Sequence, residues 1–295
     1  MEKVLLKSVQ QKVWDWPAVI GLSLVGTGAG FYSFSFLALI LSSDSSKQSQ
    51  AIAFPLAVLL MIVLGFLAVA TEAGSLLRSR YLLHRLRSSW MSVEVLTGII
   101  FVVFVAIHIF LPNQVVMILA VVAALWLLLV QGLMVCGCRA VTAWNLPIIP
   151  ILFFASGLCL GFGFWLVWTA AGKANFSLLI LIVGLCFLVI NSAMWANYLF
   201  RQRDYALRKA TKPLRQSLTL TITLGLGSSL AALLVLFLIL SIIFHLETIY
   251  LNRLSFFAGT AILAGGVYQR AAIVLKVNYL RALSAGEIKF HADKL

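Results

Sequence analysis

The chain has 295 residues, of which 62% are hydrophobic and only 11% are charged, and its mean hydropathy is +1.06. A soluble domain needs a much larger charged surface, so this composition excludes one and indicates an integral membrane protein. The formal net charge of +13 comes from residues that flank apolar segments, which makes nucleic-acid binding a poor explanation for the charge.

Eight apolar runs are long enough to cross a bilayer, which takes about 20 helical residues. In chain order they are Pro17–Ser42, Ala51–Leu77, Ser89–Leu111, Gln114–Arg139, Pro147–Ala171, Ser177–Phe200, Leu218–Leu246 and Ser255–Arg281. Because their connections are short, we predict an all-α polytopic bundle of eight transmembrane helices that forms one domain over residues 1–295. The first run is too long for a signal peptide and lacks a small-residue cleavage site, so we expect it to be retained.

The basic residues predict the orientation. With eight spans, both termini share one side of the membrane with the second, fourth and sixth loops. Seventeen lysines and arginines fall on that side: Lys3, Lys7, Lys12, Arg78, Arg80, Arg85, Arg87, Arg139, Arg201, Arg203, Arg208, Lys209, Lys212, Arg215, Arg281, Lys289 and Lys294. The other side has only three, Lys47, Lys173 and Arg253. Since cytoplasmic loops carry the excess of basic residues, we predict that both termini are cytoplasmic.

Ionisable residues inside apolar spans are costly, so each needs a partner, water or a function. Glu72 near the end of the second span and Glu94 near the start of the third lie on either side of an arginine-rich loop. Arg270 lies about ten residues before the predicted end of the last span, or about 15 Å deep. Two interpretations stay open. Glu72, Glu94 and Arg270 form a structural ion pair, or they line a polar pocket where a redox ring exchanges protons with a carboxylate.

Haem and metal are weaker alternatives. A membrane b-type haem needs two histidines at similar depth. His108 and His245 could supply one such pair, but a second pair for a relay is lacking, so we expect no haem. Four cysteines fall within the predicted apolar spans, and the spacing of the "CGC" pair sends its thiols to different sides of a helix. We therefore expect small buried residues and no metal site at Cys136, Cys138, Cys159 and Cys186.

Short motifs add a resemblance over the whole chain. The second hairpin has "GS" at Gly74–Ser75, Arg78 shortly after it, and "SVE" at Ser92–Glu94. The first span opens with "WP" at Trp16–Pro17 followed by "GTGAGFYSF", and the last contains "AGGVYQR" at Ala264–Arg270. These features resemble the membrane anchor subunit of dimethyl sulfoxide reductase. That subunit belongs to a wider group of quinone-reactive anchors, which includes those of polysulfide reductase and the nitrite-reductase-associated proteins.

The resemblance implies a site for a quinone, either menaquinone or ubiquinone. Its residues would be Glu94, Glu72, Arg78, Ser92, Arg270, Gly74 and Ser75, with Glu94 and Glu72 exchanging protons. The chain departs from the family pattern at two positions. Glu72 stands where the family has a histidine, and Gly266 stands where the last helix has a glutamate.

The resemblance also implies partners. The chain, not catalytic alone and without haem or metal of its own, would anchor a ferredoxin-like, four-cluster iron–sulfur subunit joined to a molybdopterin catalytic subunit. The basic bias favours a cytoplasm-facing complex of the sulfite-oxidising or dimethyl sulfoxide reductase type in a bacterial inner membrane. The basic loop Phe200–Ser217 would form part of the docking surface, or would serve topology alone.

A secondary transporter or channel is the competing class. Such proteins contain helices broken by glycine or proline near the midplane. The glycine runs Gly26–Gly30 and Gly161–Gly163 could be such breaks, although close helix packing explains them more simply. The chain has no convincing internal repeat, and its ionisable groups gather near one surface, which favours the anchor.

Overall fold

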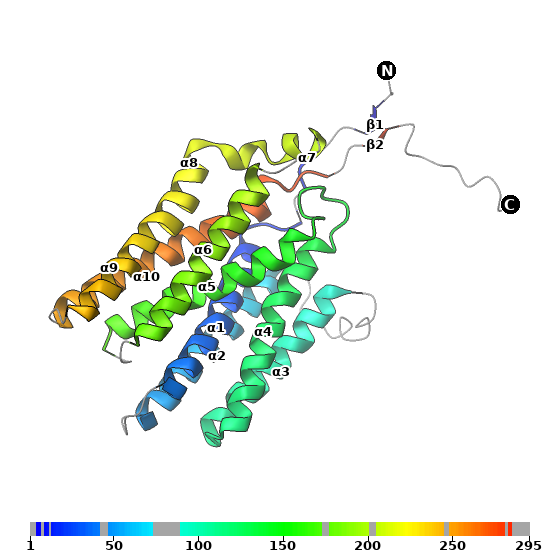
Figure 1. Ribbon diagram of the computed structural model, residues 1–295. Coiled ribbons are helices and arrows are strands. Elements are labelled where there is room, and N and C mark those ends of the chain that lie inside the picture. Colours follow the sequence, from blue (N-terminus) through cyan, green and yellow to red (C-terminus); the bar gives the residue numbers. More distant parts are fainter. Residues whose placement is uncertain are drawn as a thin grey trace.

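The structure is a computed structural model that describes residues 4–6, 9–11, 13–41, 47–72, 89–172, 177–200, 205–244, 248–280 and 283–284. Nearly all of these residues are helical, and the long helices run side by side in one bundle (Figure 1). Eight helices in this part of the chain are long and apolar enough to cross a membrane: Trp16–Leu41, Ala53–Thr71, Trp90–Phe110, Gln114–Cys136, Ile148–Ala170, Leu178–Phe200, Ser217–Ile243 and Ile249–Lys276. The predicted all-α polytopic fold is confirmed.

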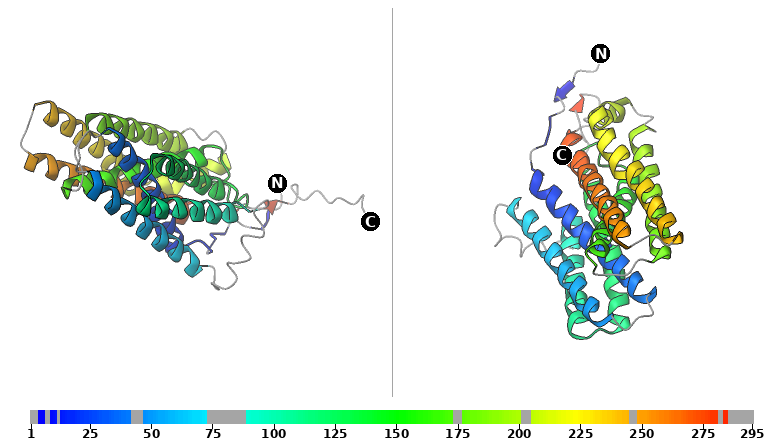
Figure 2. Two further views of the ribbon diagram at one scale, coloured as in Figure 1. Left: turned by 90° about the horizontal axis from the view of Figure 1, so that it is seen from below. Right: turned by 90° about the vertical axis from the view of Figure 1, so that its left-hand side faces the viewer.

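The helices keep the order of the predicted spans. They are α1 (Trp16–Leu41), α2 (Lys47–Glu72), α3 (Trp90–Phe110), α4 (Gln114–Cys136), α5 (Ile148–Ala170), α6 (Leu178–Phe200), α7 (Tyr205–Ala210), the 3-10 helix η2 (Lys212–Arg215), α8 (Ser217–Leu220), the π-helical segment η3 (Thr221–Leu230), α9 (Ala231–Ile243), α10 (Thr248–Ala271) and the π-helical segment η4 (Ala272–Lys276). The seventh span therefore consists of α8, η3 and α9, and the eighth of α10 and η4. Figure 2 shows the same side-by-side arrangement from two further directions.

The eighth span corrects the sequence prediction. We predicted its start at Ser255, but α10 begins at Thr248. Arg253 was assigned to the loop before this span, yet a charged side chain near a helix end can stay at the membrane boundary, and Arg253 is exposed. The span ends at Lys276, five residues before the predicted end. Part of the second predicted span, beyond Glu72, lies outside the described residues.

The segments that flank the bundle meet at one end. The short strands β1 (Val4–Leu6) and β2 (Leu283–Ser284) pair antiparallel. The backbone N–H of Gln11 donates to the carbonyl of Asn278 at 2.9 Å. Val141, in the connection between α4 and α5, forms an isolated bridge with Leu280. The chain therefore enters α1 and leaves η4 at the same end of the bundle, as an even number of spans requires (Figure 1).

Glycines bring α1 and α5 into close contact. Gly26 and Gly30 on α1 are four residues apart, as are Gly157 and Gly161 on α5, so each pair lies on one helix face. A Cβ atom on Gly30 would lie 3.0 Å from the Cα of Gly161, which leaves no room for a side chain at the crossing. Both helices continue through these positions. The glycine runs are therefore packing positions of the small-residue type used between membrane helices, and they do not break the helices.

Two apolar clusters fill the bundle, one toward each end. The cluster toward the end where the flanking segments meet includes Met134 of α4, while the other includes Leu128 of the same helix. Gln131 lies between these two residues along α4 and is fully buried. A polar layer therefore separates the two apolar clusters, and the candidate site lies in this layer.

Candidate functional site

Arg270 of α10 is the most unusual side chain of the interior, since it is completely buried. Its Nε donates to the hydroxyl of Ser156 at 3.3 Å, and its Nη2 donates to the carbonyl of Phe153 at 3.3 Å. Its Nη1 donates to the carbonyl of Leu22 and, at 3.4 Å, to Oε1 of Gln131. The guanidinium thus donates hydrogen bonds to acceptors on α1, α4 and α5. These bonds stabilise a positive charge that lipid could not solvate.

Two of the packing glycines make room for this guanidinium. A Cβ atom on Gly26 would overlap the Nη1 and Nη2 atoms of Arg270, and one on Gly157 would lie 3.1 Å from Nη2. The guanidinium also lies over the ring of Phe153, with its carbon 5.3 Å from the ring centroid, which is within the range of a cation–π contact. The glycines at the crossing of α1 and α5 thus allow the two helices to pack closely and also leave space for the guanidinium of Arg270.

Glu94 of α3 belongs to the same polar layer and is 5% exposed. Its carboxyl group interacts with the side chain of Gln131 and with the positive charge of Arg270. None of the hydrogen bonds of Arg270 to the described residues reaches Glu94. Gln131 interacts with both side chains, and its Nε2 also donates to the carbonyl of Leu22 at 3.4 Å. Glu94, Gln131 and Arg270 therefore lie together in one polar layer, and both open interpretations, the structural ion pair and the polar pocket, remain predictions.

The cluster lies at a shallow and uniform depth. At a rise of 1.5 Å per residue, the distance to the helix end is about 6 Å for Glu94, about 8 Å for Gln131 and Phe153, about 9 Å for Leu22 and Arg270, and about 12 Å for Ser156. All of these helix ends lie at the end of the bundle where the flanking segments meet. The predicted depth of about 15 Å for Arg270 is too large, because the span ends at Lys276.

The other predicted site residues have different outcomes. Ser92 is fully buried two residues before Glu94, and its hydroxyl has no hydrogen-bond partner among the described residues. Glu72 is the last residue of α2, at the same end of the bundle, and its side chain lies outside the described part. Gly74, Ser75 and Arg78 lie outside the described residues altogether. The described part of the site therefore contains Glu94, Ser92 and Arg270.

Gln131 and Ser156 also belong to the site, although they were not predicted from the sequence. Gln131 was visible as a neutral polar residue in an apolar run, but nothing in the sequence indicated that it faces Arg270. Ser156 lies between apolar residues of α5 and donates to the carbonyl of Phe153 in its own helix, at 3.1 Å. Serines commonly form this bond within a helix, so Ser156 carried no signal of its own.

His108 lies far from this layer, near the opposite end of α3. Its Nδ1 is 3.0 Å from the hydroxyl of Tyr32, and its Nε2 has no partner in the described part of the chain. The rings of Tyr32 and Phe54 contact it with centroids 5.9 and 5.5 Å away. His245, the other histidine of the haem alternative, lies outside the described residues. Phe101 and Val105, both fully buried, separate His108 from Glu94 along α3.

The cysteines differ from the expectation in two respects. Cys138 follows the end of α4 in a turn, and Cys186 is exposed on α6, so neither is a buried helix residue. Partial burial, together with the neighbouring thiol of Cys136, raises the pKa of Cys138, which favours the protonated thiol over the metal-binding thiolate. No group of three metal-binding side chains occurs among the residues that the structure describes.

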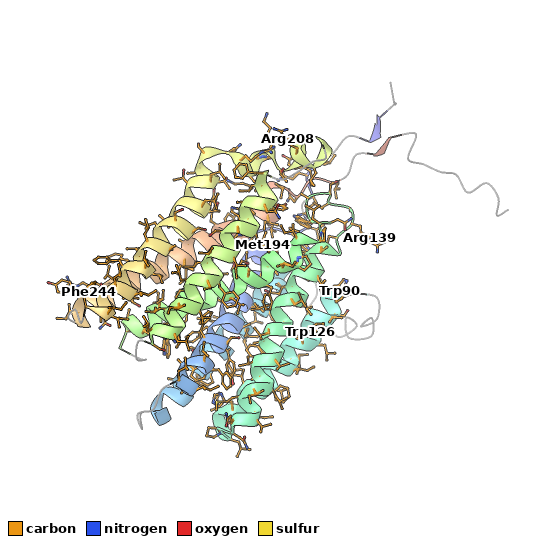
Figure 3. All side chains as sticks on the ribbon, in the orientation of Figure 1. Trp90, Trp126, Arg139, Met194, Arg208 and Phe244 are labelled. Carbon is orange, nitrogen blue, oxygen red and sulfur yellow. The ribbon has the colours of Figure 1, made fainter. Side chains whose placement is uncertain are left out.

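Basic side chains mark the end of the bundle nearest the cluster. Figure 3 shows Arg139 and Arg208 pointing outward at this end, while Phe244 lies at the other. Lys212 is also exposed, whereas the neighbouring Leu214 is fully buried, so the segment after α7 packs its apolar residues inward. The cluster therefore lies just beneath a cationic surface.

Fold and site together define a class: a polytopic helical membrane protein with a buried arginine, a glutamine and a carboxylic acid in one polar layer near one face. The chain matches no protein-family model, and it matches no curated protein.

Proposed function

We propose that this protein is the quinone-reactive membrane anchor of a multisubunit molybdoenzyme. It would exchange electrons between the quinone pool and a docked iron–sulfur subunit, which serves a molybdopterin catalytic subunit. The observation that carries the proposal is the arrangement of Glu94, Gln131 and Arg270 about 6 to 9 Å inside the end of the bundle that bears the exposed basic residues.

The residues present suit a quinone head group. A bound quinol supplies two electrons and two protons on oxidation, and a quinone takes up the same number on reduction. Glu94 has a carboxyl group able to accept or give a proton, and it lies close enough to the end of α3 to exchange that proton with water. Ser92 has a buried hydroxyl without a partner among the described residues, which can hydrogen-bond a ring oxygen.

Arg270 has a positioning and electrostatic role in this proposal. Its positive charge acts on Glu94 through Gln131, while its remaining hydrogen bonds fix the guanidinium to α1 and α5. A carboxylate in so apolar an interior needs such a compensating charge. Glu72, at the end of α2, is the second acid of the proposal, on the route between Glu94 and water.

The exposed basic side chains suit the docking of a soluble partner. Arg139, Arg208 and Lys212 are exposed at the end of the bundle beneath which the cluster lies. The proposal places this end and both termini in the cytoplasm of a bacterium, with the spans in its inner membrane. Electrons would then cross between the quinone site and the iron–sulfur subunit over a short distance.

The test compares quinol-linked turnover of the intact complex with its activity toward a soluble artificial electron donor or acceptor. Glu94→Gln keeps the size and hydrogen bonding of the side chain but removes the base, so quinol-linked turnover should fall about 100-fold or more. The activity with the artificial dye should stay unchanged. Asp15→Asn, the same chemical change at the start of α1, is the matched control and should leave both activities intact. Full quinol-linked turnover in Glu94→Gln would overturn the proposal.

Copurification separates this function from transport. The anchor should purify with two larger subunits, one containing iron–sulfur clusters and the other molybdenum. A transporter or channel should purify without them, so a chain that never brings these subunits from its native membrane would contradict the anchor.

A further inference from the structure

A second polar cluster lies on the other side of α10, next in sequence to Arg270. Asn191 of α6 and Gln269 of α10 are 7% and 3% exposed, and the Nδ2 of Asn191 donates to the Oε1 of Gln269 at 3.2 Å. The remaining polar atom of each side chain, Oδ1 of Asn191 and Nε2 of Gln269, has no partner among the described residues. One acceptor and one donor, on two side chains that are hydrogen-bonded to each other, are thus left without partners in the described interior.

The presence of one unpartnered donor and one unpartnered acceptor does not depend on how the oxygen and nitrogen atoms of the two amides are assigned. Oxygen and nitrogen of a side-chain amide can be exchanged in a structure without a visible change of shape. If both amides of Asn191 and Gln269 are exchanged, the direct hydrogen bond survives in the reverse direction. One donor and one acceptor then still lack partners. The other unpartnered side-chain atoms of the described interior, such as the hydroxyls of Ser23 and Ser35, offer no such pair.

The neighbouring polar side chains are already engaged. Trp195, one turn after Asn191 on α6, donates its indole N–H to the hydroxyl of Thr223 at 3.0 Å. Thr223 in turn donates to the carbonyl of Thr219 at 2.7 Å. These groups therefore do not supply the donor that Oδ1 of Asn191 needs. Leaving a buried polar atom unpaired is costly, so a further group is required to complete the pair.

We propose that Asn191 and Gln269 together hold a hydroxyl group that is not part of this chain. An O–H group has one hydrogen to donate to Oδ1 of Asn191 and lone pairs to accept from Nε2 of Gln269, so it matches both unpartnered atoms at once. Its source is a buried water molecule or the hydroxyl of a quinol. Binding of a water molecule here does not depend on the function proposed above, whereas binding of a quinol does.

The backbone around the cluster is closely packed. Gly227 of η3 and Gly265 of α10 lie so close that a Cβ on Gly227 would be 2.5 Å from the Cα of Gly265. Each glycine is one turn from a residue of the cluster, Thr223 and Gln269 respectively. The wide π-helical turns of η3 begin just before Thr223, and such turns occur frequently at functional sites.

A line of polar groups connects the cluster with the end of the bundle. Lys276, at the end of η4, donates to the hydroxyls of Thr219 and Tyr268, both at 2.8 Å. Thr219 is linked through its carbonyl to Thr223, and Thr223 through its hydroxyl to Trp195. Lys276 is only half-buried, so this line of polar groups leads from the water-exposed end of the bundle to Trp195, which is one turn from Asn191.

The first test is a cryo-electron microscopy map of the full protein at a resolution that shows ordered water. It should be recorded once after quinone depletion and once with added ubiquinol-1. Non-protein density within hydrogen-bonding distance of both Asn191 and Gln269 in the depleted protein supports the water. Density that appears only with ubiquinol-1 supports the quinol. A map that shows ordered water elsewhere in the interior but no density here in either state overturns the proposal.

The second test is thermal unfolding of the double variant Asn191→Leu/Gln269→Met, which removes every polar atom of the pair. If the pair holds a hydroxyl group, the melting temperature should stay the same or fall, because satisfied hydrogen bonds are lost. If the pair is dry, the melting temperature should rise, because two unpaired polar atoms leave the interior. Ser192→Ala is the matched control, since that hydroxyl is satisfied by the carbonyl of Leu188 at 2.6 Å within α6. A clear rise in the double variant alone would refute the proposal.

Discussion

The electrostatic link between Glu94 and Arg270 can be measured by removing each charge alone and then both. Arg270→Met has nearly the same length and no charge, and it deletes the hydrogen bonds to Ser156, Leu22, Phe153 and Gln131. It also leaves Glu94 buried without a compensating charge. Glu94→Gln removes the acid but keeps an amide that Gln131 can still bond.

The burial of the two side chains sets the expected magnitudes. Removing one partner of a buried charged pair costs about 3–5 kcal/mol, which we expect for Arg270→Met because Glu94 is only 5% exposed. Glu94→Gln exchanges charge-assisted interactions for neutral ones, at about 1.5–3 kcal/mol. In the double variant neither charge remains, so its loss should be no larger than that of Arg270→Met alone. The coupling free energy is then about 1.5–3 kcal/mol.

The assay is reversible unfolding of the purified protein in mixed micelles with increasing dodecyl sulfate, followed by circular dichroism. Wild type, the two single variants and the double variant are compared under one condition. Effects that add to within about 0.5 kcal/mol would show that Glu94 and Arg270 do not interact. That result would refute the argument that Gln131 connects the two charges, and with it the role of Arg270 at the proposed site.

Three further predictions concern packing, topology and haem. Gly161→Ala places a Cβ against the backbone of Gly30 and should destabilise the protein by about 1–3 kcal/mol in the same unfolding assay. Gly225→Ala, which meets only a methyl group at 3.8 Å, should be nearly neutral, and equal losses would contradict the crossing of α1 and α5. When fused after Leu295, a reporter that works only in the cytoplasm should be active, and one that works only in the periplasm should be inactive. Activity of the periplasmic reporter would move the proposed quinone site to the other face of the membrane. The purified chain should show no Soret band, whereas a stoichiometric b-type spectrum lost in His108→Ala would contradict the absence of haem.

The sequence predicted the spans well because each depends on local composition alone. A run of about 20 apolar residues has few alternatives to a membrane helix. The same reasoning failed at the start of α10, where Asn252 and Arg253 continue the helix at its end. It also gave no sign of the π-helical segments η3 and η4, because neither contains a proline that would mark an irregular turn.

The site was predictable only in part. Glu94 and Arg270 were found because ionisable residues are rare in spans, and that rule needs no knowledge of the partners. Gln131 was missed as the residue that interacts with both because α3, α4 and α10 meet only in the folded bundle. The space left by Gly26 for the guanidinium is likewise a property of how α1 crosses α5, and it cannot be derived from spacing within α1 alone.

The position of Arg270 in the last of the eight spans has a consequence for biosynthesis. A ribosome completes the eighth span last, whereas the groups that receive its guanidinium belong to α1, α4 and α5. Until that span inserts, the amide of Gln131 and the carboxyl group of Glu94 face one another without the cation that compensates them. The eighth span therefore supplies a polar partner that the first seven spans lack, and the insertion of Arg270 should stabilise the interior that they form.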